Sequence, residues 1–233
     1  MTSIPLYLTS EQNCSYLDNR ASQSAMVDVN FGMTRSIYSQ LIERGFRRSG
    51  NLVYAPHCQQ CSACIACRIK PAQFKPSRSQ KRCIEKNQDT EVIIKPCDYD
   101  AKHRDLYNRY LSYRHSETAT LSATNEYLEF FGSSWCDTRL IEFYIEKHLA
   151  AVAVVDLFND ALSAVYTFYD PEFQHYSLGT YAVLWQIAKA RELGMEHVYL
   201  GYWVENSQKM DYKKNFKPLE VYMNQQWQAF QTS

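Results

Sequence analysis

The sequence lacks any apolar run of the roughly 18 residues that a membrane-spanning helix needs. Residues 1–11 contain no basic cluster followed by a long apolar stretch, so we expect no secretory signal and a cytoplasmic protein. With 7 Gly and 7 Pro among 233 residues, neither a collagen-like repeat nor a disordered chain is predicted. Net charge is also absent, at 25 basic and 25 acidic residues, so any affinity for a polyanion must come from a local concentration of charge.

Acidic residues are missing from one long segment. No Asp or Glu occurs between Gly45 and Arg82, whereas eight Lys and Arg residues do. On a solvated surface the two signs usually alternate. The segment therefore predicts a polyanion or an acidic substrate as partner, and a basic surface without a partner is the alternative.

Cysteine is abundant, with 8 residues, and four of these form a run in which each is three residues from the next: Cys58, Cys61, Cys64 and Cys67. This spacing lets a turn bring two thiolates onto one metal ion, and Cys14 is the candidate ligand outside the run. Because we expect a cytosolic chain, we do not expect a disulfide framework. Two interpretations stay open: a zinc or iron–sulfur site at Cys14, Cys58, Cys61 and Cys64, or reduced, partly buried thiols.

The order of predicted elements indicates an α+β fold. We expect helices over residues 33–45, 98–115, 125–131 and 177–193, and strands over 67–70, 90–95, 139–146, 149–158, 161–169, 197–203 and 221–230. Pro71 and Pro76 argue against one continuous element in the basic segment. A strand meander followed by a strand–helix–strand unit matches acetyltransferase-like (GNAT-type) acyl-transfer folds, in which two splayed strands hold the donor. We expect such a domain over residues 91–233, preceded by a smaller Cys-containing, basic region over 1–90.

Short blocks along nearly the whole chain resemble one family. They are Cys14-Ser15-Tyr16-Leu17, Gly45-Phe46-Arg47-Arg48-Ser49-Gly50, residues 54–64, residues 74–82, Phe168-Tyr169-Asp170-Pro171, residues 175–181, residues 201–203 and residues 209–213. On these blocks the chain resembles the bacterial aspartate/glutamate leucyltransferases, a branch of the arginyl-tRNA–protein transferase family. The resemblance implies that leucine moves from Leu-tRNA to the α-amine of proteins that begin with Asp or Glu. It also implies an N-terminal (N-end rule) degradation signal, read by the protein-degradation machinery, and no membrane partner.

Two departures from the family pattern bear on a metal. Leu17 stands where the eukaryotic arginyl branch has a second Cys, and Ile65-Ala66-Cys67 stands where the bacterial branch usually reads apolar-Pro-apolar. We therefore predict that no cofactor is required. Three alternative functions remain: an arginyl donor, which would need a buried carboxylate; an acetyl-CoA-dependent acetyltransferase, although its glycine-rich loop is missing here; and a metal-containing nucleic-acid-binding module.

The expected reaction requires mainly that the protein position the donor ester and the acceptor amine. The donor is an activated ester, and the acceptor amine, with a pKa of about 7.7–8.0, is partly neutral near pH 7. The protein then has to orient the two groups and stabilise an oxyanion. The free amides at the start of the helix near residue 177 suit that task. The candidate catalytic residues are His175, Tyr176, Ser177 and Gly179.

Substrate binding adds two further candidate sets. For the acceptor carboxylate they are Arg78, Arg82 and Lys81, then Arg47 and Arg48, because a guanidinium binds a carboxylate bidentately; tRNA phosphates are their alternative partner. For the tRNA end, the rings that can stack a base are Tyr169, Tyr176, Tyr202 and Trp203, and the residues that can hold phosphates are Lys209, Tyr212 and Lys213.

Overall fold

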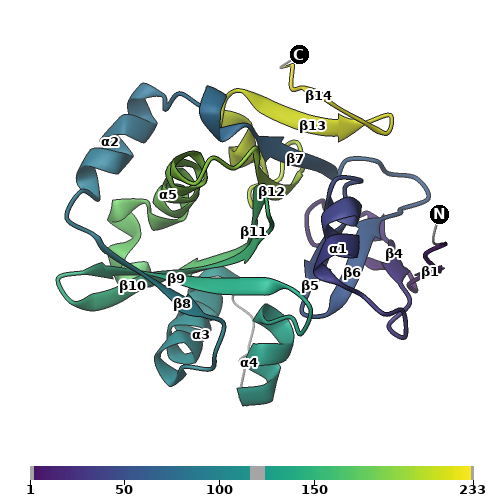
Figure 1. The fold of residues 1–233 in the computed structure, drawn as a ribbon, viewed down its shortest axis with the longest axis horizontal. Helices are drawn as coiled ribbons and strands as arrows, with labels where there is room; N and C mark the ends of the chain where they lie inside the picture. The colour runs from purple at the N-terminus through teal and green to yellow at the C-terminus, as the bar shows by residue number, and fades with distance from the viewer. Residues whose placement is uncertain (1–2, 116–123, 232–233) are drawn as a thin grey trace.

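Strands outnumber helices in the computed structural model, which describes residues 3–115 and 124–231 (Figure 1). The strands are β1 Leu6–Leu8, β2 Gln12–Asn13, β3 Ala21–Ser22, β4 Ser24–Val27, β5 Arg47–Ser49, β6 Leu52–Pro56, β7 Ile65–Ile69, β8 Glu91–Pro96, β9 Asp137–Ile145, β10 His148–Leu157, β11 Ala161–Tyr169, β12 His197–Trp203, β13 Leu219–Met223 and β14 Gln226–Ala229. The α-helices are α1 Arg35–Ile42, α2 Arg78–Lys86, α3 Ala101–His115, α4 Thr124–Phe131 and α5 Leu178–Glu192, with 3-10 helices η1 Pro71–Gln73, η2 Pro171–Tyr176 and η3 Asp211–Asn215. This mixture confirms the α+β prediction.

An eight-stranded sheet organises the molecule, in the order β14-β13-β7-β12-β11-β10-β9-β8. A four-stranded sheet, β1-β4-β6-β5, lies beside it, and β2 pairs with β3. Strand β7 hydrogen-bonds to both β12 and β13, so the first 90 residues and the remainder share one sheet. None of the described helices has the length and apolar character that crossing a membrane requires.

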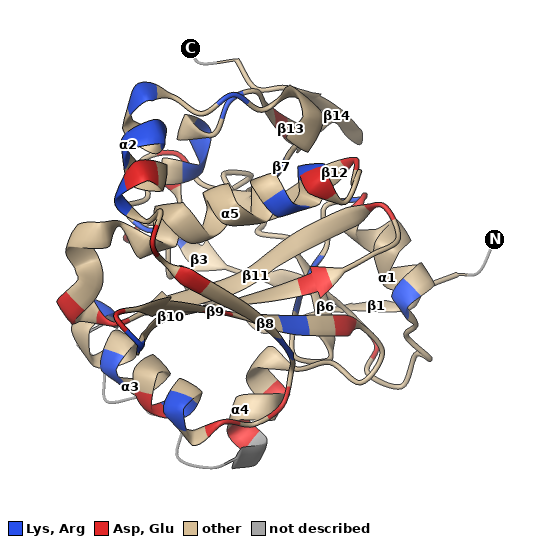
Figure 2. Ribbon diagram, turned by 60° about the vertical axis from the view of Figure 1, so that its left-hand side comes forward, with Lys and Arg blue, Asp and Glu red and all other residues tan. Residues whose placement is uncertain are grey.

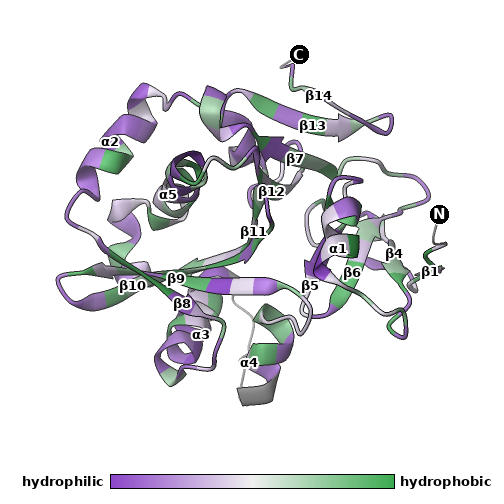
Figure 3. Ribbon diagram, in the orientation of Figure 1, coloured by the Kyte–Doolittle hydropathy of each residue, from purple (hydrophilic) through white to green (hydrophobic). Residues whose placement is uncertain are grey.

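Helices cover both faces of the large sheet, and the side chains of β10 show why. Ala151, Ala153 and Val155 point into the core that α5 covers. Val152 and Val154 point to the opposite face, into the core beneath α3 and α4. Because successive strand residues alternate between faces, a strand with no polar face requires a layer on each side. The hydrophobic central strands contrast with the hydrophilic outer helix α2 in Figure 3.

The central strands β11 and β12 separate partway along their length. Their parallel pairing runs only from Ala161 opposite His197 to Ser163 opposite Tyr199. Directly after this last pair, β11 has a bulge in its pairing with β10, and β12 has a bulge in its pairing with β7. The bulges leave Val165 of β11 and Leu200 of β12 without a residue opposite them on the neighbouring strand. Bulges bend a strand and increase its twist. The two bulges therefore place the opening between the strands at this level of the sheet.

The structure differs from the predicted elements in several places, and the short strands β1 to β6 were not predicted at all. The basic segment contains helix α2, because the chain turns after Pro76 and Ser77 then caps the helix: its hydroxyl accepts the Gln80 N–H, and the Gln80 side chain accepts the Ser77 N–H. The last predicted strand is a hairpin, β13 and β14, which turns at Asn224 and Gln225, both with positive φ.

Candidate active site

Three neighbouring cavities open where β11 and β12 separate. The helix cavity, about 610 Å³, lies at the start of α5; the cysteine cavity, about 640 Å³, lies beside the N-terminal sheet; the deep cavity, about 340 Å³, lies between them and the bulges. Tyr16 lines all three. Lys213 lines the helix and deep cavities, and Tyr202 lines the deep and cysteine cavities. We call the three together the cleft.

The first turn of α5 forms one wall of the helix cavity. Ser177 has a left-handed backbone with φ of 57°, and its carbonyl accepts the N–H groups of Thr180 and Tyr181. The first N–H groups of an α-helix have no intrahelical acceptor and carry a partial positive charge. Leu178 and Gly179, which supply these groups here, both line the cavity. The structure thus confirms the predicted helix start at Ser177 and places Leu178 and Gly179 in a cavity wall.

Aromatic rings and cations form the rest of the helix cavity. Tyr169 lines it and packs edge-on against Tyr110, with ring centroids 5.0 Å apart. Lys209, Tyr212 and Lys213 line the cavity together. Rings with an exposed face beside cations suit the bases and phosphates of a single-stranded RNA end.

The other predicted aromatic positions lie deeper. Tyr202 is buried and donates its hydroxyl to the Gly45 carbonyl at 2.8 Å. Trp203 is buried in the main core, donates its indole N–H to Asp211 at 3.1 Å and packs on Phe230 at 4.8 Å. Since its ring is enclosed by protein and does not line the cleft, we no longer assign Trp203 a base-stacking role.

The structure places His175 and Tyr176 against α2 rather than in the cleft lining. The Lys86 ammonium donates to the His175 carbonyl at 2.7 Å and lies 5.9 Å from the centre of the Tyr176 ring. The Asn87 amide donates to the Tyr176 carbonyl at 2.9 Å. These contacts fix η2 and so the start of α5, which makes positioning, rather than proton transfer, the role that the geometry favours.

Arg48 has no donor left for a substrate. Its guanidinium binds Asp156 through two contacts of 2.6 Å, and both side chains are fully buried. The remaining N–H groups donate to Thr138 and to the carbonyls of Gly50 and Phe131. An arginine has five N–H donors, and all of these are used here. The expectation that Arg48 reads the acceptor carboxylate is therefore corrected: it holds β5 against β10 and α4.

Arg47 is buried like Arg48, but its guanidinium has an unused hydrogen-bond donor among the described residues. It lines the deep cavity. Its Nη1 donates to the Phe46 carbonyl at 3.0 Å and its Nη2 to the Gly201 carbonyl at 3.4 Å. Its buried Nε has no hydrogen-bond partner among the described residues.

The predicted cations of α2 lie away from the cleft. Arg78, Lys81 and Arg82 are exposed and line none of the three cavities. They form a basic outer surface on α2, which Figure 2 shows in blue. Since α2 packs against α5, this surface borders the helix whose first turn lines the cleft.

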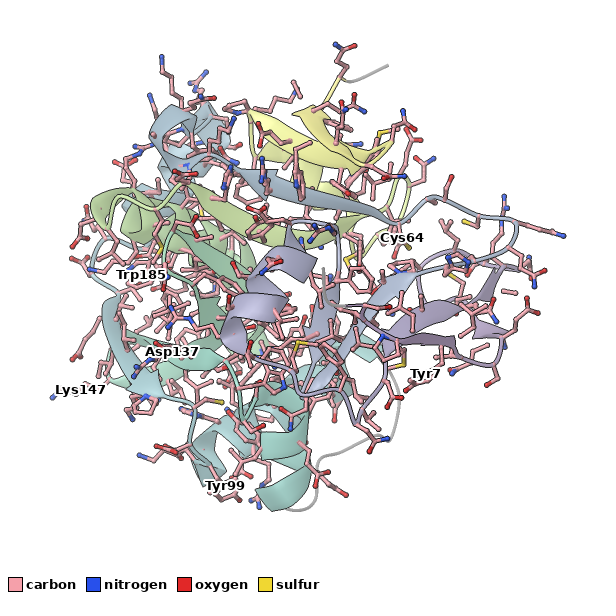
Figure 4. The ribbon with its side chains drawn as sticks, turned by 45° about the vertical axis from the view of Figure 1, so that its right-hand side comes forward. Tyr7, Cys64, Tyr99, Asp137, Lys147 and Trp185 are labelled. Carbon is pink, nitrogen blue, oxygen red and sulfur yellow. The ribbon has the colours of Figure 1, made fainter. Side chains whose placement is uncertain are left out.

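The four candidate metal ligands line one cavity, the cysteine cavity, but no three of their sulfur atoms lie within 4.8 Å of one another. Cys14, Cys58, Cys61 and Cys64 all line it. Cys64 lies between the N-terminal sheet and the C-terminal hairpin (Figure 4). Burial, with the neighbouring thiols Cys14, Cys58 and Cys61, raises the pKa of Cys64 to about 11. In the part of the chain that the structure describes, the only three metal-ligating side chains with ligand atoms within 4.8 Å of one another are Asp100, His103 and Glu142, outside this cavity.

Comparison with known proteins identifies the chain's family. The model for the N terminus of arginine-tRNA-protein transferases matches residues 12–82, and the model for their C terminus matches residues 102–223. The chain belongs to the arginine-tRNA-protein transferase family. This transferase is 48% identical over 223 residues to an aspartate/glutamate leucyltransferase from Nitrosococcus oceani, covering 95% of this chain and 94% of that one. It is 42% identical to the Pseudomonas fluorescens protein of the same name, with 97% of each chain covered.

A solved structure supports the fold alone. The C-terminal domain of a protein described as a lysylphosphatidylglycerol synthetase, from Agrobacterium fabrum, matches with a TM-score of 0.52 and 9% identity. The match covers 84% of this transferase and 64% of that chain. The two chains thus share an arrangement of strands and helices.

Three cleft residues escaped the sequence analysis: Tyr16, Tyr110 and Arg114. A signal existed for each of them. Tyr16 lies within the first recognised block, and Tyr110 and Arg114 are four residues apart on α3, a spacing that places two side chains on the same helix face. What the sequence could not show is that this face of α3 lines the same cavity as the start of α5.

Proposed function

We propose that this transferase moves leucine from Leu-tRNA to the α-amine of proteins that begin with Asp or Glu. One observation carries the choice of donor and acceptor. Among the described residues that line the three cavities there is no Asp or Glu, whereas Arg47, Arg114, Lys209 and Lys213 are present. An arginyl side chain would need a carboxylate, and an acidic acceptor needs a cation. The names of the relatives agree with this assignment.

The splayed strands support an acetyltransferase-like (GNAT-type) placement of the donor. In this proposal the leucyl ester lies in the helix cavity, with its carbonyl oxygen toward the amides of Leu178 and Gly179. Those amides stabilise the negative charge that develops as the amine attacks. The tRNA 3′ end then rests on Tyr169 and Tyr212, with Lys209 near its phosphates.

The reaction itself needs little acid–base assistance. The neutral α-amine attacks the ester carbonyl, the amide C–N bond forms, and the ester C–O bond breaks. The amine gives up a proton as the ribose oxygen gains one, so atoms and charge balance. Because orientation alone can lower the barrier by about 7–11 kcal/mol, the first turn of α5 and the wall of β11 supply most of what this step requires.

The body of the tRNA requires a larger basic surface. We assign Arg78, Lys81 and Arg82 on α2 to its phosphates, because these side chains are exposed and outside the cleft. Phosphate contacts position an RNA without reading its sequence.

We propose that the four thiols of the cysteine cavity shape the side of the cleft that receives the acceptor protein. They are of the ligand type that zinc and iron–sulfur clusters take. A bound metal would hold the segment from Cys58 to Cys64 against Cys14 and keep the thiols deprotonated. Metal analysis of anaerobically purified protein tests this: stoichiometric zinc or iron, lost with activity in Cys61→Ser, would make the metal essential.

We also propose a cellular setting from the family resemblance. The product carries leucine at its N-terminus, which is a signal for the N-end rule degradation machinery, and the reaction takes place in the cytoplasm. Stabilisation of a reporter protein that begins with Asp, in cells that lack this chain, is the expected result.

The proposed reaction is tested with labelled donors. Purified protein is incubated with radiolabelled Leu-tRNA or Arg-tRNA and with peptides that begin with Asp, Glu, Lys or Arg. Label should reach only the Asp and Glu peptides, and only from Leu-tRNA. Label from Arg-tRNA, or on the basic peptides, would overturn the proposal.

A further inference from the structure

Two buried cations meet at Gly201 in the deep cavity. Gly201 has a φ of 83°, and a Cβ built on it would lie 3.5 Å from the Lys213 Nζ and 4.0 Å from the Arg47 Nε. Both cations line the deep cavity, and both are at most 6% exposed. The absence of a side chain at Gly201 leaves a space that both cations face.

Neither cation has an anionic partner among the residues that the structure describes. The Lys213 Nζ donates to the Tyr202 carbonyl at 2.6 Å and lies 3.2 Å from the Met210 sulfur, both uncharged. Among the described residues no carboxylate forms a salt bridge with Lys213 or Arg47. Burial lowers the pKa of Lys213 to about 8. Buried charges are normally paired, so this arrangement indicates a partner that comes from outside the chain.

Two polar groups of the deep cavity have no hydrogen-bond partner among the described residues. The Arg47 Nε and the Ser163 Oγ both line it, are buried and lack a hydrogen-bond partner among the described residues. Most buried polar groups are hydrogen-bonded, and an exception calls for an explanation. These two groups and the Lys213 ammonium are the donors that the cavity offers to an anion.

The lining of the cavity selects among anions. Phe130, Phe131 and Tyr166 lie in its walls beside the cations, so an anion that is carried on a short apolar stem contacts both kinds of group. A leucyl side chain would leave both cations desolvated and unpaired. A short carboxylate attached to an apolar stem satisfies the walls and the cations together.

We infer that the deep cavity binds the side-chain carboxylate of the acceptor's N-terminal Asp or Glu, with Arg47 and Lys213 as the residues that determine acceptor specificity. This inference moves the buried Lys213 from the residues expected to hold tRNA phosphates to the acceptor site. The inference rests on the proposed function and deepens it. Lys213 and Leu200 line both the deep and the helix cavities. An acceptor anchored there therefore has its α-amine next to the place proposed for the leucyl ester.

The test compares acidic acceptors with their neutral isosteres. Peptides that begin with Asp or Asn, and with Glu or Gln, are assayed with wild-type protein, Lys213→Met and Arg47→Gln. Because hydrogen bonds to charged groups are the stronger ones, each variant should lower kcat/KM for the Asp and Glu peptides about 10- to 100-fold. The Asn and Gln peptides should change little, and so should the KM for Leu-tRNA.

Matched controls use neighbouring cations on the surface. Lys214 follows Lys213 and pairs with Asp211 at 2.6 Å, and the exposed Arg44 donates to the Gln40 carbonyl. Lys214→Met and Arg44→Gln remove the same charge at the surface and should retain wild-type preference for Asp over Asn. Thermal unfolding of each variant establishes that it folds; should Lys213→Met not fold, Arg47→Gln carries the same prediction.

A binding measurement separates this inference from the proposed reaction. Fluorescent Asp and Asn peptides are titrated with the protein without tRNA. Tighter binding of the Asp peptide, lost in the two variants, supports the inference even if no leucine is transferred. Equal effects of the variants on Asp and Asn peptides, or a rise in the KM for Leu-tRNA alone, would overturn it.

Discussion

At the scale of single residues, Gly179 stands out because the protein around it does not require a glycine. A Cβ at this position would meet only the Tyr169 ring, at the ordinary contact distance of 3.6 Å. Alanine is the better helix former by up to about 1 kcal/mol. A donor that approaches the first turn of α5 from the cleft, as proposed above, would account for the glycine.

We predict that Gly179→Ala keeps or raises thermal stability and lowers kcat/KM for Leu-tRNA at least about tenfold, because the added methyl group enters the donor site. Thermal unfolding and steady-state kinetics measure the two effects. Ala182→Gly in the buried face of α5 is the reverse control, since it should lower stability. A fully active Gly179→Ala variant would mean that the donor does not approach the first turn of α5.

Lys213 gives a second prediction, which concerns how the free energy of unfolding changes with pH. Its pKa falls from an ordinary 10.5 to about 8 on folding, because burial disfavours the charged form. Between pH 8 and 10.5 the unfolded chain therefore binds a proton that the folded chain does not, and stability rises with pH across this window. The free energy of unfolding of wild type minus that of Lys213→Met should increase by roughly 3 kcal/mol from pH 7 to pH 10.5.

Denaturant unfolding at several pH values checks this difference. Lys214→Met, which removes a surface ammonium, should show no such trend. If the difference in free energy of unfolding between wild type and Lys213→Met stays constant with pH, the Lys213 ammonium is solvated and has the pKa of an ordinary lysine.

At the scale of elements, the Arg48–Asp156 pair joins three of them. It links β5 of the small sheet to β10 of the large one, and Arg48 also donates to the carbonyl of Phe131 at the end of α4. Arg48→Met leaves the fully buried Asp156 carboxylate without its partner.

We expect Arg48→Met to lower the free energy of unfolding by about 3–5 kcal/mol. Urea unfolding measures the loss, and Arg139→Met is the control, since Arg139 pairs with Asp137 on a half-exposed surface. The double variant Arg48→Met/Asp156→Leu should recover much of the stability. No recovery would show that the carbonyl contacts of Arg48, rather than its charge pair, hold these elements together.

Helix α2 supplies a prediction about tRNA. Arg78→Ala and Arg82→Ala should weaken Leu-tRNA binding and lower the slope of log affinity against log salt by about 0.7–0.9 for each phosphate contact that is lost. The KM for the acceptor peptide should not change. A rise in that KM with unaltered tRNA affinity would instead make α2 the reader of the acceptor carboxylate.

The limits of sequence analysis are visible at α2 and at the small sheet. The pattern that predicts α5 spans 15 residues of regular helix, whereas α2 follows two prolines and was not predicted. Strands β1 to β6 are 2–5 residues long and carry no alternation that could be recognised. Their pairing depends on tertiary contacts, which local sequence does not encode.

At the scale of the whole molecule, the predicted α+β class and the family are confirmed, and the order of strands in the sheet is new information. Strand β7 lies between β12 and β13, so a segment beside the cysteine run reaches the strands that form the cleft. The basic segment was predicted as one anion site. The structure divides it into exposed cations on α2 and the buried Arg47 and Arg48, a distinction that depends on burial and not on charge.

The central claim is that a cleft with no carboxylate among its described lining residues accepts leucine and adds it to acidic N-termini. The most direct measurement is a competition in one reaction: equal amounts of Leu-tRNA and Arg-tRNA, with their amino acids labelled by different isotopes, are mixed with equal amounts of peptides that begin with Asp and Lys. Mass spectrometry then counts the four products. The account predicts Leu-Asp as the dominant product. Arg-Asp in comparable amount would contradict the assignment of the donor, and Leu-Lys in comparable amount would contradict the role of the buried cations.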